Sequence, residues 1–226
     1  MKAEYPEIVN SPRICNGPHA LNFSYGDKRF REEVEAVDPS FLEMFSFPLI
    51  EGDSTTALSN PHSVVMTQRM AFKYFGNKDP IGQVIKVENK YDFQVTGVLA
   101  ELPHNSILQF DFLVPIEFLT ELWNFPELLT RWSDFSFTTY VQLQNNASFK
   151  EVSRKIAGRI QEGDEGFEGD AFLWSFTKLY LHGLGTGRRR MAIMRMLFLI
   201  AVFILLIACI NFMNLTFFDL DYYRPK

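Results

Sequence analysis

The chain has 226 residues, of which 47% are hydrophobic and 22% charged, and this composition excludes a disordered or collagen-like polypeptide. Charge is unevenly distributed: residues 1–187 hold 25 acidic and 16 basic side chains, whereas residues 188–226 hold 2 acidic and 6 basic ones. The acidic balance of the larger part disfavours nucleic acid as a partner, because binding to phosphates requires clustered Lys and Arg.

The first patterned stretch is REEVEAVD, residues 31–38, which alternates like an exposed strand. We interpret the neighbouring carboxylates Glu32 and Glu33 as part of a solvated face, not as an acid–base pair. Asp38 then offers an N-cap and Pro39 a first helical residue, so that a short helix is expected within residues 38–52.

A strand, a helix and a sharp stop are predicted next. Residues 63–66, SVVM, are β-prone, and Thr67 can cap a helix that runs to Tyr74. Gly76 and Pro80 end this helix. The segments on either side of Asn89-Lys90 alternate in polarity, and residues 81–100 therefore predict a β-hairpin with one wet face.

The following elements include a strongly alternating strand at 135–143 and a helix whose capping box is formed by Ser148 and Glu151. The expected elements are a strand at 110–114, a helix at 115–123, a strand at 135–143, a helix at 148–161 and a strand at 171–176. Residues 183–187, GLGTG, are interpreted as a flexible joint before the arginines.

A long apolar stretch follows, in which residues 196–210 read MLFLIAVFILLIACI. A helix of about 20 apolar residues spans a hydrocarbon core of about 30 Å, so we predict one transmembrane helix over residues 194–217. Asn211 and Asn214 share a helix face near its end, where they either pack against a neighbouring helix or lie at the membrane interface.

Orientation is ambiguous from charge alone. Four arginines flank the N-terminal end of the apolar stretch, and the positive-inside rule taken by itself would place that end and the acidic domain in the cytoplasm. The N-terminus lacks the apolar core of a signal peptide.

Residues for catalysis or metal binding do not come together in the sequence. Cys15 lies in a loop-like stretch without a nearby His, and no phosphate loop, dinucleotide motif or nucleophile elbow occurs. We therefore expect no catalytic, cofactor-binding or metal-binding residues, and no enzymatic activity. The histidines stand alone: His19, His62, His104 and His182.

Three runs nevertheless resemble one family, in the family order. They are VDPSFLEMFSFPLIEGD, SVVMTQRMAFKYFGNKDPIGQVIKV and DFQVTGVLAELPHNSILQFDFLVP. Together they resemble the MacB-like periplasmic core domain of bacterial ABC transporter permeases. The later run IACINFMNL, residues 207–215, resembles the second transmembrane helix of these permeases.

The resemblance implies an α+β fold in which a mixed-sheet extracytoplasmic domain is followed by one transmembrane α-helix. The implied boundaries are 1–187 for the MacB-like periplasmic core domain, 188–218 for the helix and 219–226 for a short tail. The family has a first transmembrane helix and further FtsX-like helices, so the chain is expected to be a fragment that ends after the second helix.

The resemblance also implies structural roles within the motif that runs from VVMTQRMAFKYFG to DPIGQ. Phe72 and Phe75 are expected to fill the core, and Gly76 and Gly82 to permit turns. The full set of motif residues expected to be structural is Phe72, Phe75, Gly76, Pro80, Gly82 and Gly97.

The implied function is that of a permease subunit that couples ATP hydrolysis by a partner ATPase to movement of the periplasmic domain, for export of peptides, drugs or lipoproteins. The implied partners are a cytoplasmic ABC ATPase, a second permease chain, a periplasmic adaptor and membrane lipid, without nucleic acid. The implied location is the bacterial inner membrane with residues 1–187 in the periplasm, against the arginine count. The alternative is a membrane-anchored extracytoplasmic binding or sensory domain.

Overall fold

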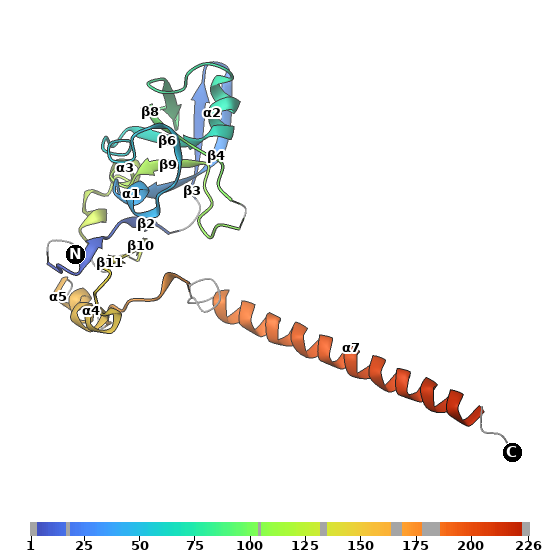
Figure 1. Cartoon of the computed structure of the whole chain (residues 1–226). Helices are drawn as coiled ribbons and strands as arrows, with labels where there is room; N and C mark the ends of the chain where they lie inside the picture. Colours follow the sequence, from blue (N-terminus) through green and yellow to red (C-terminus); the bar gives the residue numbers. More distant parts are fainter. Residues whose placement is uncertain are drawn as a thin grey trace. The chain divides into compact units, whose positions relative to one another are not determined.

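The computed structural model describes residues 4–16, 19–103, 105–131, 135–163, 169–177 and 186–222. The chain divides into two compact units, Met1–Leu173 and Trp174–Lys226 (Figure 1). The first unit contains the strands and short helices, and the second contains one long helix. Residues 183–185 of the expected joint, and also His104 and His182, lie outside the described residues.

Short strands and helices alternate through the first unit. The strands are β1 (Ile8–Asn10), β2 (Arg13–Cys15), β3 (His19–Tyr25), β4 (Lys28–Val37), β5 (Leu49–Gly52), β6 (Ser63–Thr67), β7 (Val84–Val87), β8 (Tyr91–Leu99), β9 (Phe112–Pro115), β10 (Phe137–Thr139) and β11 (Gln142–Leu143). The helices are α1 (Phe41–Phe45), α2 (Gln68–Phe75), α3 (Phe118–Leu122), the 3₁₀ turn η1 (Pro126–Leu129), α4 (Phe149–Ile156), α5 (Arg159–Gly163) and, in the second unit, α7 (Thr186–Tyr222).

The main sheet closes on itself. Strand β4 pairs antiparallel with β3 and parallel with β9, and Val34 has partners on both edges, His19 and Phe112. From β9 the ladder continues through β6, β8 and β7 and returns to β3, which completes a ring of strand pairs. Closure pairs the edges of these strands, which would otherwise remain open to other chains.

Because the ring carries packed side chains on both faces, a central strand is apolar on both sides. All five residues of β6 are buried: Val64 and Met66 belong to one core, whereas Val65 belongs to the other. This explains why the segment SVVM shows a continuous apolar run instead of alternation. The hairpin β7–β8 alternates as predicted, with Phe93 and Val95 fully buried.

Helix α2 packs on the first of these cores through one stripe of side chains. Ala71, Tyr74 and Phe75 are buried, which fits their spacing of three and four residues along a helix. The expectation that Phe72 also fills the core is wrong, because Phe72 is 66% exposed. Phe72 follows Ala71 directly in the helix, so the side chain of Phe72 points about 100° away from the buried stripe.

The strand predicted over residues 135–143 is instead two strands with different partners. β10 pairs with β2, whereas β11 pairs with β1 in a separate two-stranded sheet. The chain therefore leaves one sheet at Tyr140 and enters another. The first predicted helix also differs in its cap, since Asp38 is occupied by an ion pair with Arg13 and Ser40 holds the N-cap position.

A third, smaller core joins the N-terminal strand to α4 and is built around Ile8, Val152 and Ile156. The predicted cap of α4 is confirmed: the Ser148 hydroxyl accepts a hydrogen bond from the Glu151 amide at 3.5 Å. The helix ends at Ile156, earlier than predicted, and α5 follows after a short break.

The segment at 171–176, predicted as a strand, is not one. Its first residues are attached to α4 and its C-cap by single bonds, because the Ala171 amide donates to the Ala157 carbonyl and the Leu173 amide to the Ser153 hydroxyl. These two bonds come from a helix and not from a neighbouring strand, so no ladder forms.

Helix α7 contains a candidate membrane span at Ala192–Asn214, 23 residues long, none of which is buried within the protein. This length and composition suffice to cross a hydrocarbon core of about 30 Å. Asn211 and Asn214 lie at the end of this span with exposed side chains. Their packing against another helix remains a prediction.

The different environments of two motif phenylalanines give a matched test of the packing. Phe75→Ala should lower the free energy of unfolding by about 3 kcal/mol, because it leaves a cavity in the core. Phe72→Ala should change it by no more than about 0.5 kcal/mol. Urea unfolding of the detergent-solubilised chain, followed by tryptophan fluorescence, measures both, and equal losses would contradict the assignment of the core face.

Candidate functional site

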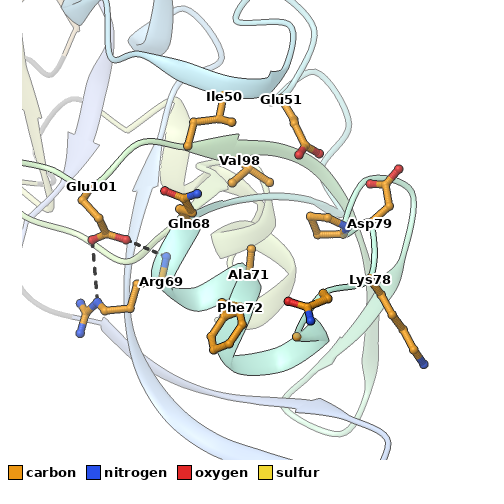
Figure 2. Close-up of a pocket in the computed structure, with 13 residues that line it drawn as sticks. Ile50, Glu51, Gln68, Arg69, Ala71, Phe72, Lys78, Asp79, Val98 and Glu101 are labelled. Carbon is orange, nitrogen blue, oxygen red and sulfur yellow. Dashed lines mark hydrogen bonds and ion pairs between the residues drawn. The ribbon is translucent and has the colours of Figure 1, made fainter.

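An open groove of about 850 Å³ lies between helix α2 and strand β5, and we name it the α2 groove (Figure 2). It coincides with the sequence motif that carried the family resemblance. Its lining residues are Ile50, Glu51, Gln68, Arg69, Ala71, Phe72, Gly76, Asn77, Lys78, Asp79, Pro80, Val98 and Glu101.

The apolar part of the groove comes from elements that are distant in sequence. Phe72 on α2 and Ile50 on β5 are 66% and 48% exposed, and Val98 of β8 lies between them as part of the groove lining. Among the described residues, β5 pairs only with β8, so one edge of this short strand carries no ladder partner.

Two motif glycines shape the chain at the end of α2. Gly76 has a φ of 64° and Gly82 a φ of 79°, a region that residues with a Cβ rarely adopt. The Gly82 amide donates to the Val95 carbonyl at 2.8 Å, which fastens the turn to β8. Pro80 is buried between these glycines. These positions agree with the turn role expected for Gly76 and Gly82.

Gly97 has a different reason to be a glycine. A Cβ at this position would lie 3.1 Å from Leu49 Cδ2 and 3.2 Å from Val65 Cγ2. Both neighbours belong to strands that flank β8, so the small residue lets β5 and β6 pack closely there.

The N-terminal end of α2 is capped from outside the helix. Glu101 accepts a hydrogen bond from the Arg69 amide at 2.6 Å and also lies 3.9 Å from its guanidinium, as Figure 2 shows. Thr67, the cap expected from the sequence, makes no side-chain hydrogen bond to the described residues. Arg69 also pairs with Asp111 at 2.5 Å, so its positive charge is shared between two carboxylates.

The opposite side of α2 is fastened to β4 by a charged group that the sequence analysis misjudged. Glu32 is only 8% exposed and accepts bonds from Lys73 at 2.6 Å and from the Tyr74 hydroxyl at 2.9 Å. Burial and the nearby Glu32 carboxylate raise the pKa of Tyr74, so it remains a donor. Lys28 donates to the carbonyls of Lys73 and Tyr74, at 2.6 and 2.8 Å, near the end of the helix.

The interpretation of Glu32 as part of a solvated face is therefore wrong. A signal was present in the sequence, because Glu32, Val34 and Ala36 share one face of an alternating strand and the other two are apolar. A carboxylate on an apolar face requires a partner. Lys73 is this partner, and it lies on a helix about forty residues further along the chain. The local sequence around Glu32 does not predict this pairing.

Two histidines that the sequence left isolated have polar neighbours. His19 Nε2 lies 3.1 Å from the thiol of Cys15, which is in strand β2 and not in a loop, and burial lowers the pKa of His19. His62 Nε2 lies 2.8 Å from a Glu121 carboxylate oxygen. Within the part of the chain that the structure describes, no group of three or more His, Cys, Asp or Glu could hold a metal ion.

The family model of the MacB-like periplasmic core domain matches residues 2–159, more than half of the chain. The chain belongs to this family. The predicted fold class is confirmed, since a mixed α+β domain is followed by one apolar helix, as expected for a MacB-like periplasmic domain with a transmembrane helix. The family assigns the chain to the periplasmic domains of ABC-type permeases.

Solved structures share this fold at low sequence identity. A domain of a Porphyromonas gingivalis protein named as a permease has a TM-score of 0.59 and 24% identity, and the match covers 71% of this chain and 66% of that one. The chain thus spans slightly less than two thirds of that relative.

Two named transporters are similar as well. The extracellular domain of the ABC-type transporter YknZ from Gram-positive bacteria has a TM-score of 0.53 and 15% identity, with 75% of this chain and 82% of that one covered. The periplasmic region of MacB from Actinobacillus actinomycetemcomitans has a TM-score of 0.50 and 14% identity, covering 71% and 70%. No curated protein gives a significant match.

The attachment of α2 to β4 can be tested on neighbouring carboxylates of the MacB-like domain. Glu32→Ala should cost about 2 to 3 kcal/mol in unfolding free energy, because the Tyr74 hydroxyl and the half-buried Lys73 lose their partner. Glu33→Ala, which removes an exposed side chain from the same strand, should cost no more than about 0.5 kcal/mol. Chemical unfolding curves give the free energy of unfolding of both variants. A decrease in Glu33→Ala as large as that in Glu32→Ala would argue against a stabilising role of the Glu32–Lys73 ion pair.

Proposed function

We propose that the MacB-like domain and helix α7 form a permease subunit that couples ATP hydrolysis by a cytoplasmic partner ATPase to movement of the domain. The observation that carries the proposal is the length of α7. It is one continuous helix of 37 residues, Thr186–Tyr222, while its candidate membrane span takes up 23 of them. At about 1.5 Å per residue, the helix is roughly 25 Å longer than a hydrocarbon core of about 30 Å.

A helix that continues beyond the membrane without a break can carry displacement from one side to the other. Rigid secondary elements with two discrete arrangements are one means by which distant sites are coupled. Family membership supports this role, because the matched domain belongs to ABC-type permeases. The proposed location is the bacterial inner membrane, with the MacB-like domain on the periplasmic side.

The proposed partners are an ABC ATPase subunit, a second permease chain, a periplasmic adaptor and surrounding lipid. The subunit itself is proposed to be no enzyme; its role is mechanical. The exported cargo is proposed to be a peptide, a drug or a lipoprotein. A second candidate function is a membrane-anchored binding domain, which is favoured by the open α2 groove with its exposed Phe72 and Ile50.

Assembly through the membrane distinguishes these two functions. The double variant Asn211→Leu/Asn214→Leu should reduce co-purification of an untagged copy and of the ATPase by about threefold or more, because each interhelical amide hydrogen bond contributes about 0.6 to 2 kcal/mol. The matched control is Ile210→Leu/Met213→Leu on adjacent positions. Quantitative mass spectrometry after mild-detergent purification from the native host provides the measurement.

The proteins that purify with the unmodified chain also distinguish the two proposed functions. A permease subunit should purify with an ATPase in a fixed ratio and with a second copy of itself. A chain that purifies as a monomer without any ATPase would contradict the permease proposal and favour the anchored binding domain.

A further inference from the structure

Strand β4 holds a second carboxylate on an inward face, on the side opposite to Glu32. Side chains two residues apart on a strand share a face, so Glu35 lies on the face of Val37. In register it pairs with Leu113 of β9. Val37 and Leu113 are both fully buried in the second core, and Glu35 is therefore placed at the margin of an apolar core.

Among the described residues, no cation compensates the charge of Glu35. Glu32 has Lys73 and Tyr74, but no hydrogen bond or ion pair joins the Glu35 carboxylate to any of the described residues. The cation on the neighbouring strand, Arg13, is occupied by a two-point ion pair with Asp38. A half-buried carboxylate without a partner is costly, and such groups concentrate at binding sites.

Glu35 lines a cavity of about 200 Å³, which we name the Glu35 cavity. Apolar and aromatic residues predominate in its lining, but polar groups supply about half of the surface that it exposes; the lining residues are Ile14, Cys15, Asn16, Glu35, Val37, Phe41, Ile107, Leu108, Gln109, Phe110, Thr138 and Tyr140. An enclosed apolar cavity of about 150 Å³ accommodates a benzene ring. The Glu35 cavity is partly open to solvent, and its volume is of the size of one ring with a short substituent.

The chemistry of the wall selects the kind of ligand. A carboxylate favours a cation, and the half-buried ring of Tyr140, with Ile107 and Leu108 beside it in the lining, favours a cation with an apolar body. Phe41 and Phe110 are buried and pack against each other behind this surface. We propose that the Glu35 cavity binds a small organic ammonium ion with an aromatic body. This inference goes beyond the proposed function and does not depend on it, because it rests only on residues of the MacB-like domain.

Binding should depend on pH in a defined direction. Burial, together with the like charge of Glu33, raises the pKa of Glu35 to about 7. The other titratable groups at the cavity are the Cys15 thiol and the Tyr140 hydroxyl, whose pKa is raised by burial. The cation binds the ionised carboxylate, so affinity should increase about tenfold between about pH 6 and pH 8, as the Glu35 proton is lost.

The test uses the full chain in detergent micelles and two probes of nearly equal shape, benzylammonium and benzyl alcohol. Isothermal titration calorimetry, with empty micelles as the blank, should show benzylammonium binding at least about tenfold more tightly than the alcohol at pH 8. Equal affinities for the two probes, or no binding of benzylammonium, would overturn the proposal without any variant being made.

A pair of variants then locates the charge. Glu35→Gln should remove the preference for benzylammonium and its pH dependence, whereas Glu33→Gln, exposed and two residues away on the same strand, should retain both. Circular dichroism verifies that each variant is folded. A preference that survives in Glu35→Gln, or that disappears equally in Glu33→Gln, would contradict the assignment to Glu35.

Discussion

The rest of the domain depends on strand β4 being paired along both edges. β3 and β9 lie on its two sides, and the ring of strand pairs closes through them. Because the sheet is closed, side chains pack against both faces of β4, and neither face is exposed to water along its whole length. The burial of Glu32 on one face and the partial burial of Glu35 on the other follow from this constraint.

These carboxylates are handled in opposite ways. Glu32 is matched by Lys73 and Tyr74, and the match fastens α2 to the sheet. With one side of α2 fixed, the side that carries Phe72 faces the groove beside β5. Glu35 has no such match among the described residues, and it lines the Glu35 cavity. A structural ion pair and a candidate binding site therefore lie on opposite faces of the same strand.

Local signals predicted much of the fold, and long-range pairing explains what they missed. The hairpin β7–β8 and the capped helix at Ser148 depend on neighbouring residues, and the structure shows both. The division of residues 135–143 depends on partners more than one hundred residues away, which a single sequence does not reveal. Gly76 and Gly82 were predictable as turn residues. The apolar wall of the groove was not, because it combines Ile50 of β5 with Phe72 of α2, and the exposure of Phe72 follows only from the packing of its neighbours.

The periplasmic orientation of the domain is the central claim of the functional account. It is opposite to the orientation that the positive-inside rule predicts from the arginines before the membrane span. A cysteine placed at Lys150, an exposed position of α4, reports it directly in intact cells treated with a membrane-impermeant maleimide. The native Cys15 is buried and Cys209 lies within the membrane span, so both contribute little background. The account predicts labelling in cells whose outer membrane has been mildly permeabilised and whose inner membrane is intact. Labelling only after the inner membrane is disrupted would place the domain in the cytoplasm and contradict the account.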